Sequence, residues 1–186
     1  MTLGPRVNGH SANQTSPFRY LWMVFGCWPV GLSLNSSDVI CDVMFVLDTN
    51  VLVAGLFSRR GASFWLLERA VDGRLPIAVS VALALEYEDV LLRPAILAQG
   101  WASAEQVSTV LDDILAEATL VQPMRVRRRP ALPDPGDDLV LECALEAHAG
   151  AIVTMNIRDF ATVSAAYGLR ILKPGDLVAE FRKEEQ

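Results

Sequence analysis

The stretch FVLDTNVLVAG (45–55) decides the fold and places the first chemically informative side chain. Its apolar start predicts a short buried strand, and Asp48 follows where that strand ends. In open parallel α/β sheets, ligands bind beyond the carboxyl ends of the strands, so a carboxylate there is placed to meet a metal ion or a phosphate. An Asp in this setting also commonly caps the helix that follows. The stretch by itself leaves both interpretations open.

Strand and helix signals alternate along the chain from Met44 onwards. Short apolar runs predict strands, and longer stretches with helical spacing and capping residues predict helices. The predicted strands are 44–47, 76–80, 119–123, 151–154 and 169–172, and the predicted helices are 63–73, 81–92, 103–118, 138–148 and a short one after Pro174. Such alternation is typical of an α/β domain with a central, mostly parallel sheet flanked by helices. We expect this domain to span 44–182.

The composition fits one globular domain in a reducing compartment. Of 186 residues, 52% are apolar and 20% are charged, a balance that supports a buried core. The net charge of -6 argues against a protein that coats nucleic acid with a broad basic surface. It argues little against a nuclease whose site is built from carboxylates. The 3 cysteines form no CxxC pair, and the 2 histidines lie far apart, which disfavours zinc chemistry. We therefore expect a cytoplasmic protein.

Residues 1–43 differ in composition from the rest of the chain. They begin with a part rich in Gly, Asn, Ser and Pro, and 21–34 form a short apolar run. That run is too short and too interrupted by Gly and Pro for a membrane span, and no A-x-A cleavage site follows it. We interpret 1–43 as an N-terminal extension that is disordered or precedes a true start at Met44. A signal or anchor is the less favoured alternative, and no membrane association is expected.

The stretch SVALALEYEDVLLRP (80–94) predicts a helix that carries a second carboxylate close to the core. On a helical wheel, Glu86 borders the apolar stripe, whereas Glu88 and Asp89 lie farther from it. A carboxylate beside a buried stripe requires a paired charge or a bound cation. Arg93 lies two turns along the helix and is the alternative partner, so helix geometry alone leaves the role of Glu86 open.

Acidic residues also gather in DPGDDLVLECAL (134–145). Asp134 can cap a helix that begins at Pro135, and Asp137 then falls in the first turn, an arrangement that stabilises a helix by ~1 kcal/mol. Three acids within five positions exceed what capping requires. Like charges this close repel unless a cation lies among them.

A further polar cluster follows the strand predicted at 151–154, where Thr154, Asn156 and Asp159 lie at or just beyond the strand end. Together with Asp48, these residues could converge on one edge of a parallel sheet. Oxygen ligands suit Mg²⁺ or Mn²⁺, ions that promote phosphodiester hydrolysis by activating water and neutralising charge on the phosphate. The sequence contains no P-loop, dinucleotide-binding glycine motif, serine elbow or catalytic Cys–His pair.

In order and spacing, these motifs resemble the PIN-domain family, and within it the VapC-related toxins of bacterial toxin–antitoxin systems. The matching stretches are VLDTNVLVAG, ALEYEDVLLRP, DPGDDLVLECAL and IVTMNIRDF, which together span nearly all of 44–182. The resemblance implies a three-layer domain around the parallel sheet. It also implies an endoribonuclease that requires Mg²⁺ or Mn²⁺.

The resemblance assigns metal-binding and catalytic roles to individual residues. The three acidic positions of the family fall on Asp48, Glu86 and Asp137, which are implied to hold the ion. The chain departs from the family at a fourth position, where many relatives carry Asp and this sequence has Asn156. Asp159 is the candidate substitute, which leaves a second metal ion in doubt.

Substrate-positioning roles are implied for Asn50, Thr154 and Arg158. The implied partners are an RNA substrate, a small antitoxin protein and a second copy of the chain in a homodimer. The basic loop RVRRR (125–129) is a candidate contact for the RNA backbone or the antitoxin.

Two other functions compete with the nuclease. One is a PIN-fold binding module that has lost activity and acts through RNA or a partner protein, which Asn156 motivates. The other is an aspartate-phosphorylated phosphatase of the haloacid type. It is disfavoured, because its motif requires a second Asp where Asn50 stands.

Overall fold

The strands form two short parallel sheets that meet through a single bridge. The computed structural model describes residues 43–122, 132 and 134–184. Its strands are β1 (Phe45–Leu47), β2 (Ala78–Ser80), β3 (Thr119–Val121), β4 (Ala151–Val153) and β5 (Arg170–Leu172). One sheet has the order β1-β4-β5 and the other pairs β2 with β3. A parallel bridge between Phe45 and Ile77 joins β1 to the segment that leads into β2.

Every strand pairing among the described residues is parallel, as the sequence predicts. The register places Leu47 opposite Val153 and Val153 opposite Leu172, so the strands of the larger sheet end level with one another. Side chains that follow β1 and β4 therefore emerge at the same edge.

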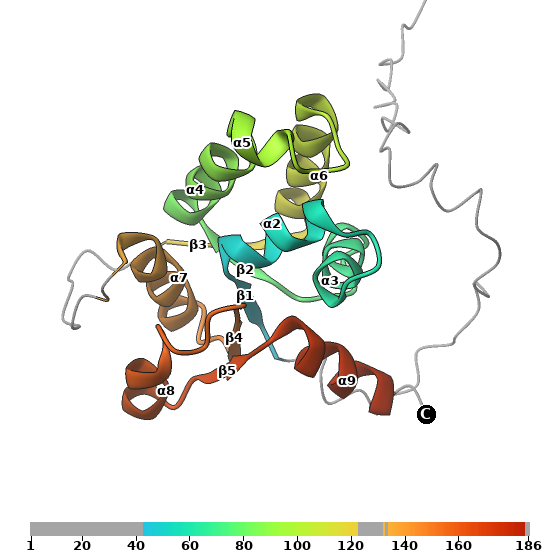
Figure 1. The fold of residues 1–186 in the computed structure, drawn as a ribbon. Helices are drawn as coiled ribbons and strands as arrows, with labels where there is room; N and C mark the ends of the chain where they lie inside the picture. The colour runs from blue at the N-terminus through green and yellow to red at the C-terminus, as the bar shows by residue number, and fades with distance from the viewer. Residues whose placement is uncertain (1–42, 123–131, 133, 185–186) are drawn as a thin grey trace, which may run out of the picture.

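Eight helices lie within the described part of the chain. They are α2 (Thr49–Phe57), α3 (Ala62–Val71), α4 (Val81–Leu91), α5 (Pro94–Leu97), α6 (Ala104–Glu117), α7 (Pro135–Glu146), α8 (Ala161–Tyr167) and α9 (Pro174–Glu184). Figure 1 shows α7 and α8 on one side of the strands and α3 and α9 on the other. The helices α4 and α6 lie beside the smaller sheet. The result is the helix–sheet–helix layering that the sequence indicates.

Local capping explains where several helices begin. Ser80 accepts a 3.2 Å hydrogen bond from the backbone N–H of Leu83, which fixes the start of α4 as predicted. Ser103 and Gln106 form a capping box at the start of α6, in which each side chain accepts from the other residue's backbone N–H. These ends depend on residues within one turn, so the sequence reveals them.

The structure adds three helices that periodicity does not predict, and it lengthens a fourth. The helix α2 is apolar around most of its surface, so it lacks the polar face that marks an amphipathic helix. The helices α5 and α8 are short. The helix predicted at 138–148 instead begins at Pro135 and ends at Glu146, because Asp134 caps it.

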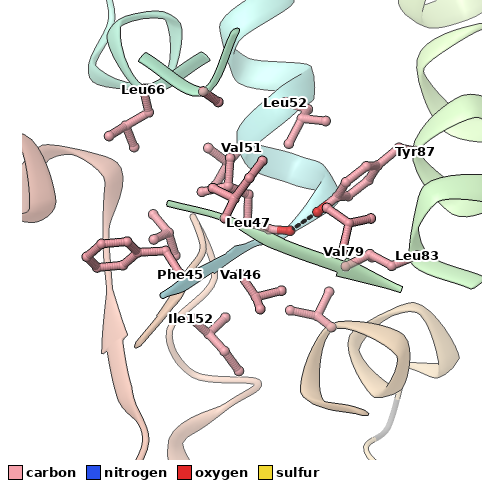
Figure 2. Close-up of a cluster of buried hydrophobic side chains, with 14 of the residues drawn as sticks. Phe45, Val46, Leu47, Val51, Leu52, Leu66, Val79, Leu83, Tyr87 and Ile152 are labelled. Carbon is pink, nitrogen blue, oxygen red and sulfur yellow. Dashed lines mark hydrogen bonds between the residues drawn. The ribbon is translucent and has the colours of Figure 1, made fainter. Parts of the chain in front are cut away.

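The core lies between the strands and the flanking helices. Figure 2 shows apolar side chains from β1, α2, α3, β2, α4 and β4 packed into one cluster. The Cys143 thiol is buried in this core and forms no disulfide. Cys27, Cys41, nearly all of 1–43 and the basic loop 125–129 lie outside the described residues. No described helix has both the length and the hydrophobicity to cross a membrane.

Candidate active site

Asp48 lies at the junction of β1 and α2, where it both ends the strand and caps the helix. Its backbone N–H donates to the carbonyl of Val153 on β4 at 2.9 Å. Its carboxylate accepts from the backbone N–H of Asn50 at 3.3 Å and from Asn50 Nδ2 at 2.6 Å. The side chain is only 5% exposed. The capping interpretation is therefore correct, and the carboxylate still occupies the edge where parallel sheets bind ligands.

Thr154 holds the same carboxylate from the end of β4. Its hydroxyl donates to Oδ2 of Asp48 at 2.6 Å and accepts from Asn50 Nδ2 at 3.3 Å and from the backbone N–H of Asn156 at 2.9 Å. The Oδ1 atom of Asn50 accepts from the backbone N–H of Met155 at 3.0 Å. Asn50 and Thr154, both predicted to position substrate, thus form a hydrogen-bonded group around Asp48.

The environment of Asp48 acts on its ionisation in two directions. Burial raises the pKa of the carboxyl and is the largest effect, because the charged form loses water. The hydrogen bonds from Thr154 and Asn50 lower the pKa, and the negative charge of Asp134 raises it. The net result is a raised pKa. A cation beside this carboxylate would oppose the effect of burial.

Asp137 lies within electrostatic reach of carboxylates from separate elements. It lies half-buried in the first turn of α7, and its pKa is raised from 3.8 to about 6. Burial is the largest cause, followed by the charges of Asp48, Asp134, Asp159 and Asp138. These groups come from the end of β1, the start of α7 and the segment after β4. Like charges brought together by the fold therefore raise the cost of ionising Asp137.

The two acids that flank Asp137 have backbone partners of their own. Asp134 caps α7 by accepting from the N–H of Gly136 at 2.8 Å. Asp138 accepts from the N–H of Leu132 at 3.0 Å. Within the residues that the structure describes, no hydrogen bond or ion pair is found for the carboxylate of Asp137. The capping role that the sequence allows in this cluster thus belongs to Asp134.

Glu86 faces the start of α7 from the neighbouring helix α4. Its Oε1 atom lies 3.8 Å from the position that a Cβ would take at Gly136. The side chain is half-buried. Arg93, the alternative partner, forms its salt bridge with Asp89. Among the described residues no salt bridge is found between Arg93 and Glu86, although the charge of Glu86 contributes, after Asp89, to the raised pKa of Arg93.

Glu88 lies on a different surface of α4. It is exposed and lines a groove of about 330 Å³ between α4, α6 and β3. The groove is mainly apolar, and none of the predicted site residues lines it. The position of Glu88 agrees with its prediction as a solvated charge.

Asn156 and Asp159 contact each other just beyond β4. Asn156 Nδ2 donates a hydrogen bond to Asp159 Oδ2. Asp159 is close enough to Asp137 to raise its pKa. Arg158 is exposed, and no hydrogen bond or ion pair joins it to the site in the described ranges. The structure therefore brings Asp159 toward the carboxylates and leaves Arg158 at the surface.

The donor set suits a hard divalent cation, but the carboxylates are not drawn together around one point. All of the predicted ligand atoms are oxygens, which Mg²⁺ and Mn²⁺ prefer. Among residues 43–122, 132 and 134–184, no group of three Asp, Glu, His or Cys side chains is arranged to hold an ion. In the same ranges no salt bridge is found for Asp48, Glu86 or Asp137, so no paired charge offsets the repulsion among these carboxylates.

Sequence reasoning missed one residue at this edge. Tyr87 lies on the apolar side of α4 and is only 1% exposed. Its hydroxyl, however, donates a hydrogen bond to the carbonyl of Leu47, the residue before Asp48 (Figure 2). The only sequence signal is the residue type, because a buried tyrosine usually finds a partner for its hydroxyl.

The fold and this edge define a class: a parallel α/β domain with carboxylates gathered beyond the carboxyl ends of its strands. Comparison with protein families matches residues 44–158 to the PIN domain. The match covers more than half of the chain, which therefore belongs to the PIN-domain family. Comparison with curated proteins finds no match. PIN domains are generally metal-dependent nucleases that act on RNA, so the family gives this chain a nuclease-type fold.

Proposed function

We propose that this protein is an endoribonuclease that requires Mg²⁺ or Mn²⁺ to hydrolyse RNA phosphodiester bonds. The observation that carries the proposal is the placement of Asp48 at the end of β1 and of Asp137 in the first turn of α7, where the charge of Asp48 adds to the effect of burial in raising the pKa of Asp137. Such a collection of negative charge destabilises the folded protein unless a cation binds there. The membership of the chain in a family of metal-dependent nucleases supports the same conclusion.

In this proposal Asp48, Glu86 and Asp137 bind the ion. The chemistry that a bound ion would supply there is activation of water and neutralisation of charge on the phosphate. Glu86 and Asp137 are half-buried, whereas Asp48 is only 5% exposed. Asp48 is the fixed member, because the hydrogen bonds from Thr154 and Asn50 hold its carboxylate in one orientation.

The remaining predicted residues surround this centre. Asp159, whose charge acts on Asp137, and Asn156, which donates to Asp159, would offer further oxygen atoms to a second ion or to water. Arg158 is exposed on the same segment and would contact the phosphate of the substrate. These roles explain why polar residues follow β4 directly.

The test compares Asp48→Asn and Asp137→Asn with Glu88→Gln as the matched control. We expect both Asp variants to lose cleavage of single-stranded RNA in Mg²⁺ or Mn²⁺ while their circular dichroism stays that of the wild type. Glu88→Gln should retain activity, because Glu88 lines a different surface. Cleavage at the wild-type rate by either Asp variant would show that the site is assigned wrongly.

A binding module without catalysis is the second candidate, and two observations favour it. Asn156 replaces an acid that many relatives carry, and the described carboxylates do not form a preassembled ion site. Titration with Mn²⁺ separates the two functions. The nuclease should be stabilised by the ion in a thermal-unfolding experiment, whereas a module without a site should show no change.

We further propose that the protein is the cytoplasmic, homodimeric toxin of a toxin–antitoxin pair, with its nuclease domain at 44–182. The resemblance to VapC-related toxins supports this role. Expression should then arrest growth, and a small protein encoded beside the gene should relieve the arrest.

Light scattering on the purified chain measures its oligomeric state. Mass spectrometry of the native amino terminus tests whether 1–43 are translated.

A further inference from the structure

The backbone pairing between the two sheets ends close to the candidate site. β1 pairs with β4 along all three of its residues, but toward β2 the described part of the chain shows only the bridge at Phe45. The N–H of Phe45 donates to the carbonyl of Pro76 at 2.9 Å. The backbone of Leu47, two residues further along the strand, faces the same side, where no described strand pairs with it. Its buried carbonyl therefore requires a hydrogen-bond donor from another element.

The donor is the hydroxyl of Tyr87 on α4. Its ring is 1% exposed, so water cannot replace the contact. A phenol is protonated at neutral pH, so the hydroxyl is able to donate. Figure 2 shows the bond crossing from α4 to the end of β1.

The position of this bond in the chain gives it a consequence beyond core packing. The acceptor carbonyl belongs to the residue immediately before Asp48, and the donor side chain belongs to the residue immediately after Glu86. Neighbouring residues on a helix point about 100° apart. Tyr87 can thus enter the core while Glu86 faces the start of α7, where its Oε1 lies 3.8 Å from the Cβ position of Gly136.

We propose that Tyr87 is a positioning residue that sets the distance between the carboxylates of Asp48 and Glu86. Its hydroxyl connects α4 to the end of β1 by a hydrogen bond to Leu47. This bond lies beyond the Phe45–Ile77 bridge that joins β1 to the segment leading into β2. The inference rests on the proposed function, because it concerns two of the three residues that would bind the ion.

The test is Tyr87→Phe in the full chain, which keeps the ring and removes only the hydroxyl. Leu83→Val is the matched control, because Leu83 is fully buried one turn earlier on the same helix and carries no polar group. Mn²⁺ affinity is measured by calorimetry at a temperature where all variants are folded. Tyr87→Phe should bind Mn²⁺ on the order of tenfold more weakly, as is usual when a residue that orients a metal ligand is lost. Leu83→Val should bind it as the wild type does.

Kinetics and a double variant separate positioning from general destabilisation. Tyr87→Phe should lower kcat at limiting Mn²⁺ with KM for RNA unchanged, and saturating Mn²⁺ should restore kcat. In a Glu86→Gln background, the same substitution should have little further effect on Mn²⁺ affinity, because the ligand that it positions is already altered.

The outcomes are distinguishable. If Tyr87→Phe binds Mn²⁺ as tightly as Leu83→Val does, Tyr87 is only a core residue and the inference is wrong, while the proposed function stands. If the wild type binds no Mn²⁺, the proposed function fails and the inference fails with it.

Discussion

The hydroxyl of Thr154 donates a 2.6 Å hydrogen bond to Oδ2 of Asp48, although 106 positions separate the two residues in the chain. The bond links the ends of β1 and β4, which lie side by side in the sheet. Thr154 is fully buried, so no water substitutes for it. The hydroxyl oxygen of Thr154 also accepts a hydrogen bond from the backbone N–H of Asn156. One threonine therefore orients the candidate metal ligand and the segment that follows β4.

Replacing Thr154 by Val should weaken both the fold and the site. Val has a similar shape but leaves Asp48 without one donor and the N–H of Asn156 without its acceptor. A loss of about 1–3 kcal/mol in unfolding free energy is expected for buried groups left unsatisfied. The pKa of Asp48 should rise further, because Thr154 lowers it. Chemical denaturation and Mn²⁺ titration measure the two effects.

Thr154→Ser is the control for this substitution, since it keeps the hydroxyl. It should retain most of the Mn²⁺ affinity of the wild type. Equal Mn²⁺ affinities for the Val and Ser variants would mean that the hydroxyl does not orient Asp48.

Replacing Asp137 by Asn should stabilise the metal-free protein at pH 7.5 while abolishing cleavage. The folded-state pKa of about 6 lies above the ordinary value of 3.8, so folding favours the protonated form. This contribution to stability is fully present below about pH 3.8 and is lost as the pH rises through about 6. Asn remains neutral throughout, so its advantage over Asp should be absent at pH 3.8 and largest above pH 6.

Urea denaturation of both proteins between pH 3.8 and 7.5 measures this difference. Mn²⁺ should reduce the difference in unfolding free energy between the two proteins, because the ion binds ionised Asp137 and stabilises the wild type alone. A difference in stability that does not vary with pH would show that Asp137 ionises as freely in the folded protein as in the unfolded chain.

Glu86→Gln and Glu88→Gln form a pair that separates two surfaces of one helix. Glu86→Gln should lower Mn²⁺ affinity and the cleavage rate, because its carboxylate faces the start of α7. Glu88→Gln should leave both unchanged, because Glu88 lines the groove between α4 and α6. Calorimetry with Mn²⁺ and an RNA cleavage assay provide the comparison. If Glu88→Gln lowered Mn²⁺ affinity and the cleavage rate more than Glu86→Gln does, Glu88 would be the metal ligand on this helix.

Asn156→Asp tests the position where the resemblance to the family leads us to expect an acid. The new carboxylate would lie beside Asp159, which now accepts a hydrogen bond from Asn156. Without metal, the like charges should lower the melting temperature. With Mn²⁺, the additional oxygen ligand should give this variant a larger stabilisation than the wild type shows. An equal Mn²⁺-dependent shift in the two proteins would place residue 156 outside the metal site.

Many parts of the fold follow from short stretches of the sequence. Ser80, Ser103 and Asp134 mark helix starts because a cap requires only neighbours within one turn. Alternating strand and helix signals predict the parallel sheet, because parallel strands need crossover connections. The helix α2 is not predicted by its pattern, because a helix that is apolar around nearly its whole surface shows no helical periodicity of apolar and polar residues.

The candidate site divides in the same way. The sequence by itself determined that Asp48 follows a strand and that acids gather at the start of α7, because both are local facts. Only the tertiary structure decided that Thr154 hydrogen-bonds to Asp48 and that Tyr87 reaches the carbonyl of Leu47. It also decided that burial, together with surrounding carboxylates, raises the pKa of Asp137. The reason is physical. These interactions join residues that are distant in the chain, and they exist only once strand register and helix packing bring those residues within reach.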